Sequence, residues 1–264
     1  MASLTERLRL PKPVVYALLC VPYLLLSLVP KDADLWVFGA DGGTRFAGNP
    51  KYAFLHGSEH REDVTPVWIS KDREVVEEVS DAGYTAYHAS SLTARYLSVR
   101  AGVVVVSHGL TDVVWWAHGG AEVVQLWHGV SFKRKRWISR KERERLSFVE
   151  RLFLRHVLWR CDFVTVTSSA LVEMHSRAFD VPEGNVLVTG YPRHDPLFGP
   201  VDGERLGSPD RVHEELEGTD ETVVMYLPTW RDTGGNPLRD GGLDLESLDS
   251  VLAAHGARMS VATG

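Results

Sequence analysis

Short apolar runs alternate with segments of helical spacing along most of the chain. Residues 72–82, for example, place Val75, Val76 and Val79 on one helical face and are followed by Gly83, a common helix stop. The apolar runs are short and rich in β-branched residues, as in parallel strands that are buried on both faces. We expect strands at 35–38, 67–70, 84–87, 103–106, 123–126, 163–167 and 186–190. The alternation predicts an α/β protein with a doubly wound sheet, whose ligands bind at the carboxyl ends of the strands.

A polar stretch then divides the chain. Residues 196–219 are rich in Gly, Pro, Glu and Asp, which is typical of a linker. A strand at 222–227, a helix at 243–255 and the start of a strand at 258–262 are expected after it. Because only about 45 residues follow the linker, they are too few for an independent α/β domain. We therefore expect a membrane-associating segment at 1–33, a first domain at 34–198, a linker at 199–220 and an incomplete second domain at 221–264.

The amino-terminal segment carries the membrane signal. Residues 14–29 form sixteen positions without a charge, and basic residues precede them. A spanning helix needs about 20 apolar residues, and Pro22 would shorten or kink a helix here. The interpretation that we favour is a monotopic segment at the cytoplasmic face of the membrane, with its basic flank on anionic headgroups. A short spanning helix and an ordinary buried helix are the alternatives.

Charge is unevenly distributed in an otherwise ordinary globular composition. The chain is 44% hydrophobic and 24% charged, with a net charge of −6. Residues 133–160 nevertheless hold eleven Lys and Arg against three acids, which indicates an anionic partner such as phosphate, nucleotide or lipid. A solvated helix face is the alternative, and nucleic acid is disfavoured because no aromatic platform accompanies the bases. Cys20 and Cys161 lack metal-ligand spacing, so we expect no disulfide and no bound metal.

His128 is the first candidate for chemistry. It stands just after the strand expected at 123–126 and is followed by Gly129 and then by the basic run. An imidazole at the carboxyl end of a strand, beside cationic groups, suits proton abstraction next to a phosphate. Taken alone, a histidine here is more often a core residue that ends a strand.

A glycine-rich loop follows the first expected strand. Residues 39–48 have neither the G-x-G-x-x-G order of a dinucleotide fold nor the G-x-x-x-x-G-K-[ST] order of a phosphate loop. The loop could form a backbone nest for an anion near Asn49 and Lys51, where a helix is expected to begin. A plain strand-to-helix turn is the alternative.

Several expected strand ends carry Gly with His, or Pro with Arg and Asp, among them Ser107-His108-Gly109. Four segments in order resemble the family of CDP-glycerol glycerophosphotransferases, the teichoic-acid primases and polymerases. Members tend to carry an N-P-K or N-x-K segment after the first strand, then Q-x-W-H-G-x-x-x-K, G-x-P-R-x-D and A-P-T-W/F-R-D segments. In this chain the corresponding segments are 49–51, 125–133, 190–195 and 227–232, with Leu227 in place of the usual small residue.

The resemblance implies a GT-B-like arrangement, with two Rossmann-type domains and an active site between them. It implies transfer of glycerol phosphate from CDP-glycerol to a lipid-linked or polyol-phosphate acceptor, without a cofactor. His128 matches the base position of the family. The candidate substrate or phosphate contacts are Asn49, Lys51, Gly129, Lys133, Arg134, Arg193, Asp195, Thr229, Arg231 and Asp232. For each Arg-Asp pair among them, a structural salt bridge at a turn is the alternative.

The chain departs from the family pattern in its second domain. Members continue to a further catalytic histidine in a K-x-H-P-like segment and to a D-Y-S-S-like segment that binds the donor, and neither is in this sequence. A fragment, an interrupted reading frame or a second chain that supplies the missing half would explain this, and we expect little or no transfer by this polypeptide. A nucleotide-sugar glycosyltransferase and a non-catalytic, membrane-associated acceptor-binding module are the competing functions. The sequence carries no signal for an oligomeric state.

Overall fold

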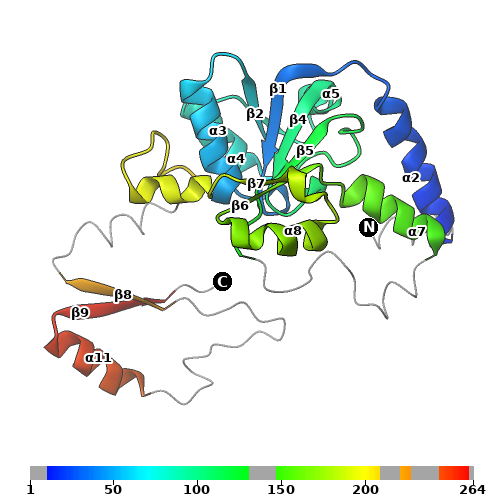
Figure 1. The fold of residues 1–264 in the computed structure, drawn as a ribbon. Helices are drawn as coiled ribbons and strands as arrows, with labels where there is room; N and C mark the ends of the chain where they lie inside the picture. Colours follow the sequence, from blue (N-terminus) through cyan, green and yellow to red (C-terminus); the bar gives the residue numbers. More distant parts are fainter. Residues whose placement is uncertain (1–10, 131–146, 209–220, 227–243, 262–264) are drawn as a thin grey trace. The chain divides into compact units, whose positions relative to one another are not determined.

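The computed structural model describes residues 11–130, 147–208, 221–226 and 244–261 (Figure 1). The chain divides into two compact units, residues 1–207 and 208–264. The first unit contains a seven-stranded, fully parallel sheet, which confirms the α/β class. Its strands are β1 (Asp32–Gly39), β2 (Thr65–Ser70), β3 (Ala86–His88), β4 (Ala101–Val106), β5 (Glu122–Gln125), β6 (Phe163–Val166) and β7 (Val186–Val188).

The order of the strands locates the expected ligand crevice. The sheet runs β3-β2-β1-β4-β5-β6-β7, so the chain builds outwards from β1 in one direction and from β4 in the other. This is the order of a Rossmann-type sheet, in which the loops after the two central strands diverge and leave a crevice at the carboxyl edge. The switch point therefore lies at the ends of β1 and β4.

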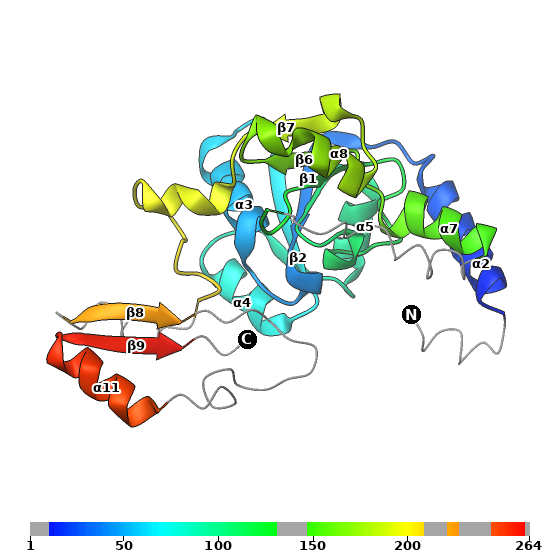
Figure 2. The same ribbon diagram turned by 60° about the horizontal axis from the view of Figure 1, so that its bottom comes forward.

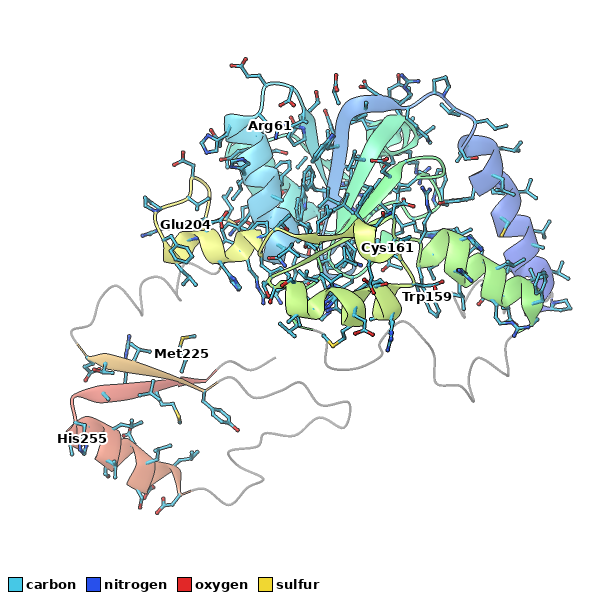
Figure 3. The ribbon with its side chains drawn as sticks, viewed as in Figure 1. Arg61, Trp159, Cys161, Glu204, Met225 and His255 are labelled. Atoms are coloured by element: carbon cyan, nitrogen blue, oxygen red, sulfur yellow. The ribbon has the colours of Figure 1, made fainter. Side chains whose placement is uncertain are left out.

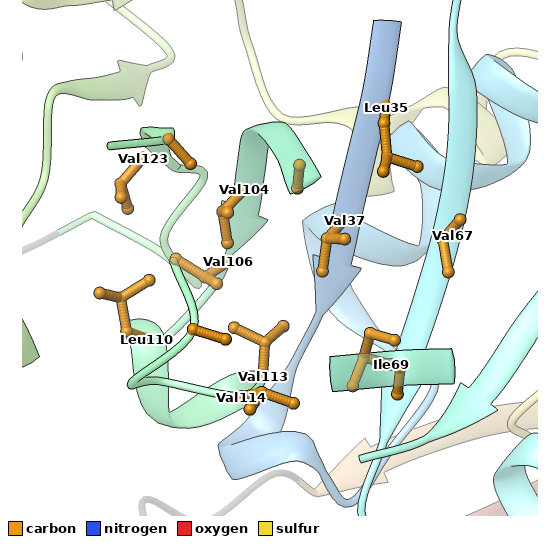
Figure 4. Packing of buried hydrophobic residues seen from close by; sticks show 14 residues of the cluster. Leu35, Val37, Val67, Ile69, Val104, Val106, Leu110, Val113, Val114 and Val123 are labelled. Carbon is orange, nitrogen blue, oxygen red and sulfur yellow. The ribbon is translucent and has the colours of Figure 1, made fainter. Parts of the chain in front are cut away.

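Two hydrophobic clusters cover the two faces of the sheet. Leu35 and Val37 of β1 belong to one cluster, which includes Ala94 of α5 (Leu92–Arg100) (Figure 4). Phe38 points to the other face and packs with Phe54 of α3 (Gly48–His60) and Val79 of α4 (Arg73–Asp81). The alternation follows from the two-residue period of a strand. Helix α8 (Val172–Phe179) packs through Ala178 and Phe179 in a further cluster with Val164 and Val166 of β6.

Short polar side chains begin the helices where the sequence predicts them. Asp72 accepts a hydrogen bond from the backbone N–H of Glu74 at the start of α4. Ser91 caps α5 by accepting from the N–H of Ala94. Each cap satisfies an N–H group that a helix otherwise leaves without a partner.

The amino-terminal apolar run forms a helix that packs at one end of the unit. Helix α2 (Lys12–Leu26) continues through Pro22 and lies beside α7 (Phe148–Phe153), as both ribbon views show (Figures 1 and 2). The Tyr16 and Phe153 rings stack with centroids 4.9 Å apart, and α7 passes directly into a π-helical turn, η3 (Leu154–Leu158). The carboxyl end of α2 fits against Gly119, where an added Cβ would lie 2.3 Å from the Tyr23 carbonyl oxygen.

The linker begins later than the sequence indicated. Val201 and Leu206, placed in the 199–220 linker by composition, pack against the cluster that contains Phe54. The backbone N–H of Gly207 donates to Glu78 Oε1 at 2.7 Å. The first unit accordingly extends to Gly207, because these apolar side chains gain burial that the polar composition of the stretch conceals.

The described residues of the second unit form a strand-helix-strand motif. Strand β8 (Thr222–Tyr226) pairs in parallel with β9 (Ala257–Val261), and α11 (Leu245–Ala254) connects them. Asp244 caps α11 by accepting from two backbone N–H groups. A parallel pair joined by a helix is the start of a further Rossmann-type sheet, as the sequence predicts.

Candidate active site at the carboxyl edge of the sheet

Four loops meet at the carboxyl edge of the first sheet. Asp41 begins the turn η1 (Asp41–Gly43) after β1, and His108 lies directly after β4. His128 follows β5, and Arg193 lies in η6 (Pro192–Leu197) after β7. Residues from distant parts of the sequence are therefore collected at one edge, because every strand of the sheet points the same way.

The turn after β5 brings His128 to the edge. Gln125 Oε1 accepts a hydrogen bond from the Trp127 backbone N–H at 3.2 Å. Trp127 adopts φ 54°, in the left-handed region that a bulky residue rarely enters. Its indole is buried and meets the Phe179 ring edge-on, with centroids 4.9 Å apart. The buried indole and the glutamine hold this unusual backbone, which leaves His128 half-buried just beyond the core.

Side chains from outside the loop hold the carbonyl oxygens of residues 126–129. Asn49 Nδ2 donates to the first two oxygens at 3.1 and 2.8 Å. Arg193 Nη1 donates to the third at 2.9 Å, and Tyr191 Oη donates to the fourth at 2.9 Å. Burial raises the pKa of Tyr191, which keeps its hydroxyl proton available as the donor. Four consecutive carbonyls are thus fixed by three side chains, and the backbone that carries His128 is tightly positioned.

Two aromatic contacts fix the ring of His128. It stacks on Trp127 with ring centroids 4.1 Å apart and an interplanar angle of 30°. It also stacks on His108, at 4.5 Å and 18°. A ring held by its backbone and by two neighbours loses little rotational freedom when it meets a substrate, which is a requirement for efficient proton transfer.

The glycine-rich loop holds a protein carboxylate. Asp112 ends the turn η2 (Leu110–Asp112), is fully buried, and accepts from the N–H of Gly42 at 2.8 Å. It also accepts from the N–H groups of Ser107 and His108 at 2.8 and 2.7 Å. Burial raises the pKa of Asp112, and the backbone donors oppose that rise. The glycine-rich loop therefore contributes one N–H group, that of Gly42, to the binding of the Asp112 carboxylate, and this contact lies away in sequence from the nest expected near Asn49 and Lys51.

Lys51 differs from its expected position. Its side chain is 3% exposed, and Nζ donates to the carbonyl oxygens of Glu204 and Leu206 at 2.5 Å each. Burial lowers its pKa to about 8, an effect that Glu78 and Glu204 partly offset. Glu204 lies in the segment that follows η6 (Figure 3). The ammonium group therefore fixes the backbone of residues 201–207 within the first unit. The sequence had instead predicted that Lys51 contacts a substrate phosphate.

Of the other predicted contacts, four lie within the described residues and five lie outside them. Asn49 and Arg193 meet at the edge, where the Arg193 backbone N–H donates to Asn49 Oδ1 at 3.3 Å, while Asp195 is exposed. Gly129 belongs to the anchored loop through its carbonyl oxygen. The rest lie outside the described residues: Lys133, Arg134, Thr229, Arg231 and Asp232.

Sequence reasoning overlooked three residues of this edge, Asp41, Asp112 and Tyr191. Asp41 and Tyr191 stand inside segments that the sequence had already singled out, so their polar groups were available signals. Asp112 follows His108 by four residues and gives no pattern of its own. Its role depends on a tertiary contact with the glycine-rich loop.

Comparisons with known proteins identify the family. The family model described as CDP-Glycerol:Poly(glycerophosphate) glycerophosphotransferase matches residues 22–255. A teichoic acid poly(glycerol phosphate) polymerase from Staphylococcus epidermidis is 27% identical over 82% of this chain and 30% of its own length. A teichoic acid glycerol-phosphate transferase from Staphylococcus aureus is 26% identical over 86% of this chain and 59% of its own length.

A solved structure shares the fold. The wall teichoic acid polymerase TagF superimposes with a TM-score of 0.58 at 20% sequence identity, over 97% of this chain and 64% of that one. This likeness agrees with the GT-B-like fold class that the sequence predicted. The chain spans between 30% and 64% of the length of these three proteins. Since the family model matches most of the sequence, this chain belongs to the family of CDP-glycerol:poly(glycerophosphate) glycerophosphotransferases.

Proposed function

We propose that this chain supplies the acceptor side of a glycerophosphate transfer. Glycerol phosphate would move from CDP-glycerol to a lipid-linked or polyol-phosphate acceptor of a cell-envelope polymer. The observation that carries the proposal is the anchored loop of residues 126–129, which presents a half-buried histidine at the carboxyl edge of a Rossmann-type sheet. The family match extends through that loop.

His128 would act as the general base. Its imidazole accepts the proton of an acceptor hydroxyl, and the hydroxyl oxygen attacks the phosphorus that carries glycerol in CDP-glycerol. A new P–O bond to the acceptor forms, the P–O bond to CMP breaks, and CMP leaves with the electron pair. A positioned base of this kind contributes about 10²- to 10⁴-fold to a rate. The Arg193 side chain donates to a carbonyl oxygen of this loop, and its positive charge would attract the phosphate groups of the substrates.

The membrane contact belongs to this proposal. None of the helices in the ranges that the structure describes is long and apolar enough to cross a bilayer. Helices α2 and α7 nevertheless leave many apolar side chains exposed: Val14, Leu18, Val21, Leu24, Leu25, Phe148 and Leu152. An apolar surface of this kind fits a monotopic attachment at the cytoplasmic membrane face, where a lipid-linked acceptor would be presented.

The test measures CMP release from CDP-glycerol in the presence of a lipid analogue that ends in glycerol phosphate. The chain is assayed alone and joined to the remainder of the second domain of the Staphylococcus aureus relative. We expect acceptor-dependent release from the joined protein and a loss of at least about 100-fold in His128→Ala. His56→Ala, on the exposed side of α3, is the matched control and should retain full activity.

Two results would favour the competing functions. Nucleotide release from UDP-sugars but not from CDP-glycerol would identify a nucleotide-sugar glycosyltransferase. Binding to acceptor-bearing vesicles without any turnover, and equally in His128→Ala, would identify a non-catalytic acceptor-binding module.

A further inference from the structure

A second histidine lies against the proposed base. The rings of His108 and His128 are almost parallel, at 18°, and their centroids are 4.5 Å apart. His108 comes from the end of β4 and His128 from the loop after β5, neighbouring strands of the sheet. The proposed mechanism gives His108 no role, although its ring is stacked on the ring of the proposed base, His128.

Ser107 determines which nitrogen of His108 carries a proton. Its hydroxyl donates to Asp112 Oδ2 at 3.3 Å, so its single proton is used there. The same oxygen accepts from the backbone N–H of Asp41 at 3.3 Å and lies 2.9 Å from His108 Nδ1. Since a hydroxyl has one donor and two acceptor sites, the contact with His108 is one in which Nδ1–H donates.

Asp41 adds a carboxylate on the same side of the ring. Its Oδ1 lies 3.4 Å from His108 Nδ1, the distance of an ion pair when the imidazole is protonated. Asp41 is held at this place by its backbone, which adopts φ 49° in the turn after β1. His108 is thus flanked by a carboxylate, a hydroxyl and the ring of the base.

We propose that His108 is a positioning residue for the His128 base, and that it holds the proton of the stacked imidazole pair beside Asp41 so that the His128 ring stays neutral. The inference deepens the proposed function and rests on it. Two imidazolium ions at 4.5 Å would repel each other, whereas one imidazolium and one neutral ring stack favourably. A neutral His128 can accept the proton of an acceptor hydroxyl, and a protonated one cannot.

The charged surroundings favour this assignment. The Asp112 carboxylate also adjoins His108, because it accepts from the His108 backbone N–H. Two cations lie close to these groups: Lys71 Nζ donates to the carbonyl oxygens of Gly42 and Thr111 and interacts with Asp112, and Arg193 Nη1 donates to the carbonyl oxygen of His128. The carboxylates of Asp41 and Asp112 therefore adjoin His108, and they stabilise a positive charge on that ring.

The test follows the His128 ring by NMR in the full chain and needs no transfer activity. The ¹H–¹³C signal of the ring is titrated between pH 5 and pH 9 in the parent protein, in His108→Phe and in Asp41→Asn. Phenylalanine preserves a flat ring against His128 without a charge. Asparagine preserves the size of Asp41 and tolerates its left-handed backbone. Asp180→Asn is the matched control, because Asp180 has φ 55° at the C-cap of α8 and its carboxylate pairs with Arg155 instead of a histidine.

We expect the midpoint of the His128 titration to rise by about 0.5 to 1 pH unit in both variants, because each releases the shared proton to His128. Asp180→Asn should leave it unchanged. An unchanged or lowered midpoint in a folded His108→Phe or Asp41→Asn protein would overturn the inference. Failure of the proposed function would be recognised separately, because CMP release would then be the same in His128→Ala as in the parent protein.

Discussion

Helices α2 and α3 reverse the usual relation between composition and burial. Helix α2 is almost entirely apolar in sequence, yet most of its described side chains are exposed, with Val15 and Tyr23 buried. Helix α3 contains glycine, asparagine, lysine, glutamate and histidine, and yet it is the helix that completes the core. Its buried residues are Asn49, Pro50, Lys51, Phe54, Leu55 and Gly57.

This difference shows that the position of a helix relative to the sheet determines which of its side chains are buried. Helix α3 lies across the face formed by β1 and β2, so that its polar residues on that side, Asn49 and Lys51, are enclosed and must find partners inside the protein (Figure 1). Helix α2 touches the unit along one narrow side, against α7 and Gly119, and its wider apolar face remains uncovered. Four substitutions, ordered by expected effect, would break or sharpen this comparison.

The largest effect is expected from Phe54→Ala on the inner side of α3. Phe54 is fully buried and meets the rings of Phe38, Phe46 and Trp68 edge-on. Removing it should lower the free energy of unfolding by about 3 to 5 kcal/mol, measured by urea denaturation. Phe148→Ala on the exposed face of α7 is the matched control, and its effect should stay within about 0.5 kcal/mol. Equal losses in the two variants would contradict the contrast.

Asn49→Ala should cost about 2 to 3 kcal/mol of unfolding free energy. It leaves two carbonyl oxygens of the His128 loop and the Arg193 backbone N–H without their partner in a buried place. Asn185→Ala is the control, since Asn185 makes a single hydrogen bond, to the Asp162 carbonyl. The role assigned to Asn49 fails if the two variants are equally stable in the same denaturation assay.

A double substitution on the exposed face of α2, Leu24→Ser with Leu25→Ser, should weaken binding to anionic vesicles. We expect the bound fraction in sedimentation to correspond to an affinity about tenfold lower, because two leucines lose contact with the apolar interface. The free energy of unfolding should hardly change. Leu187→Ser with Val188→Ser, at exposed positions of β7, is the control. A similar loss of binding in both would remove the case for α2 as the contact surface.

The smallest effect concerns Lys51 and its pH dependence. Its pKa falls from the ordinary 10.5 to about 8 in the folded protein, so the unfolded chain binds its proton more tightly. Stability should therefore rise with pH between about 8 and 10.5, by about 1 kcal/mol between pH 8 and pH 9. Denaturation of the parent protein and of Lys51→Met at both pH values isolates this contribution. A difference between the two proteins that stays constant with pH would argue against a buried ammonium.

Much of the fold and part of the site could be predicted from the sequence. Strands and helices followed from local periodicity, and the rule that ligands bind at the carboxyl ends of parallel strands placed His108, His128 and Arg193 at one edge. The partners of these residues could not be predicted in the same way. Lys51 is adjacent to the glycine-rich loop in sequence, but its ammonium group meets carbonyl oxygens about 150 residues further along.

The sequence by itself determined the order of elements, the parallel sheet, the family and the histidine that follows β5. These depend on local spacing and on short motifs, which act over a few residues. Only the tertiary structure decided what each polar group meets. It placed the Asp112 carboxylate against the N–H of Gly42, stacked His108 on His128, and left α2 exposed while α3 became core. The physical reason is that a hydrogen bond or a ring contact acts over a few ångströms in space, and sequence distance does not record which atoms the folded sheet brings within that range.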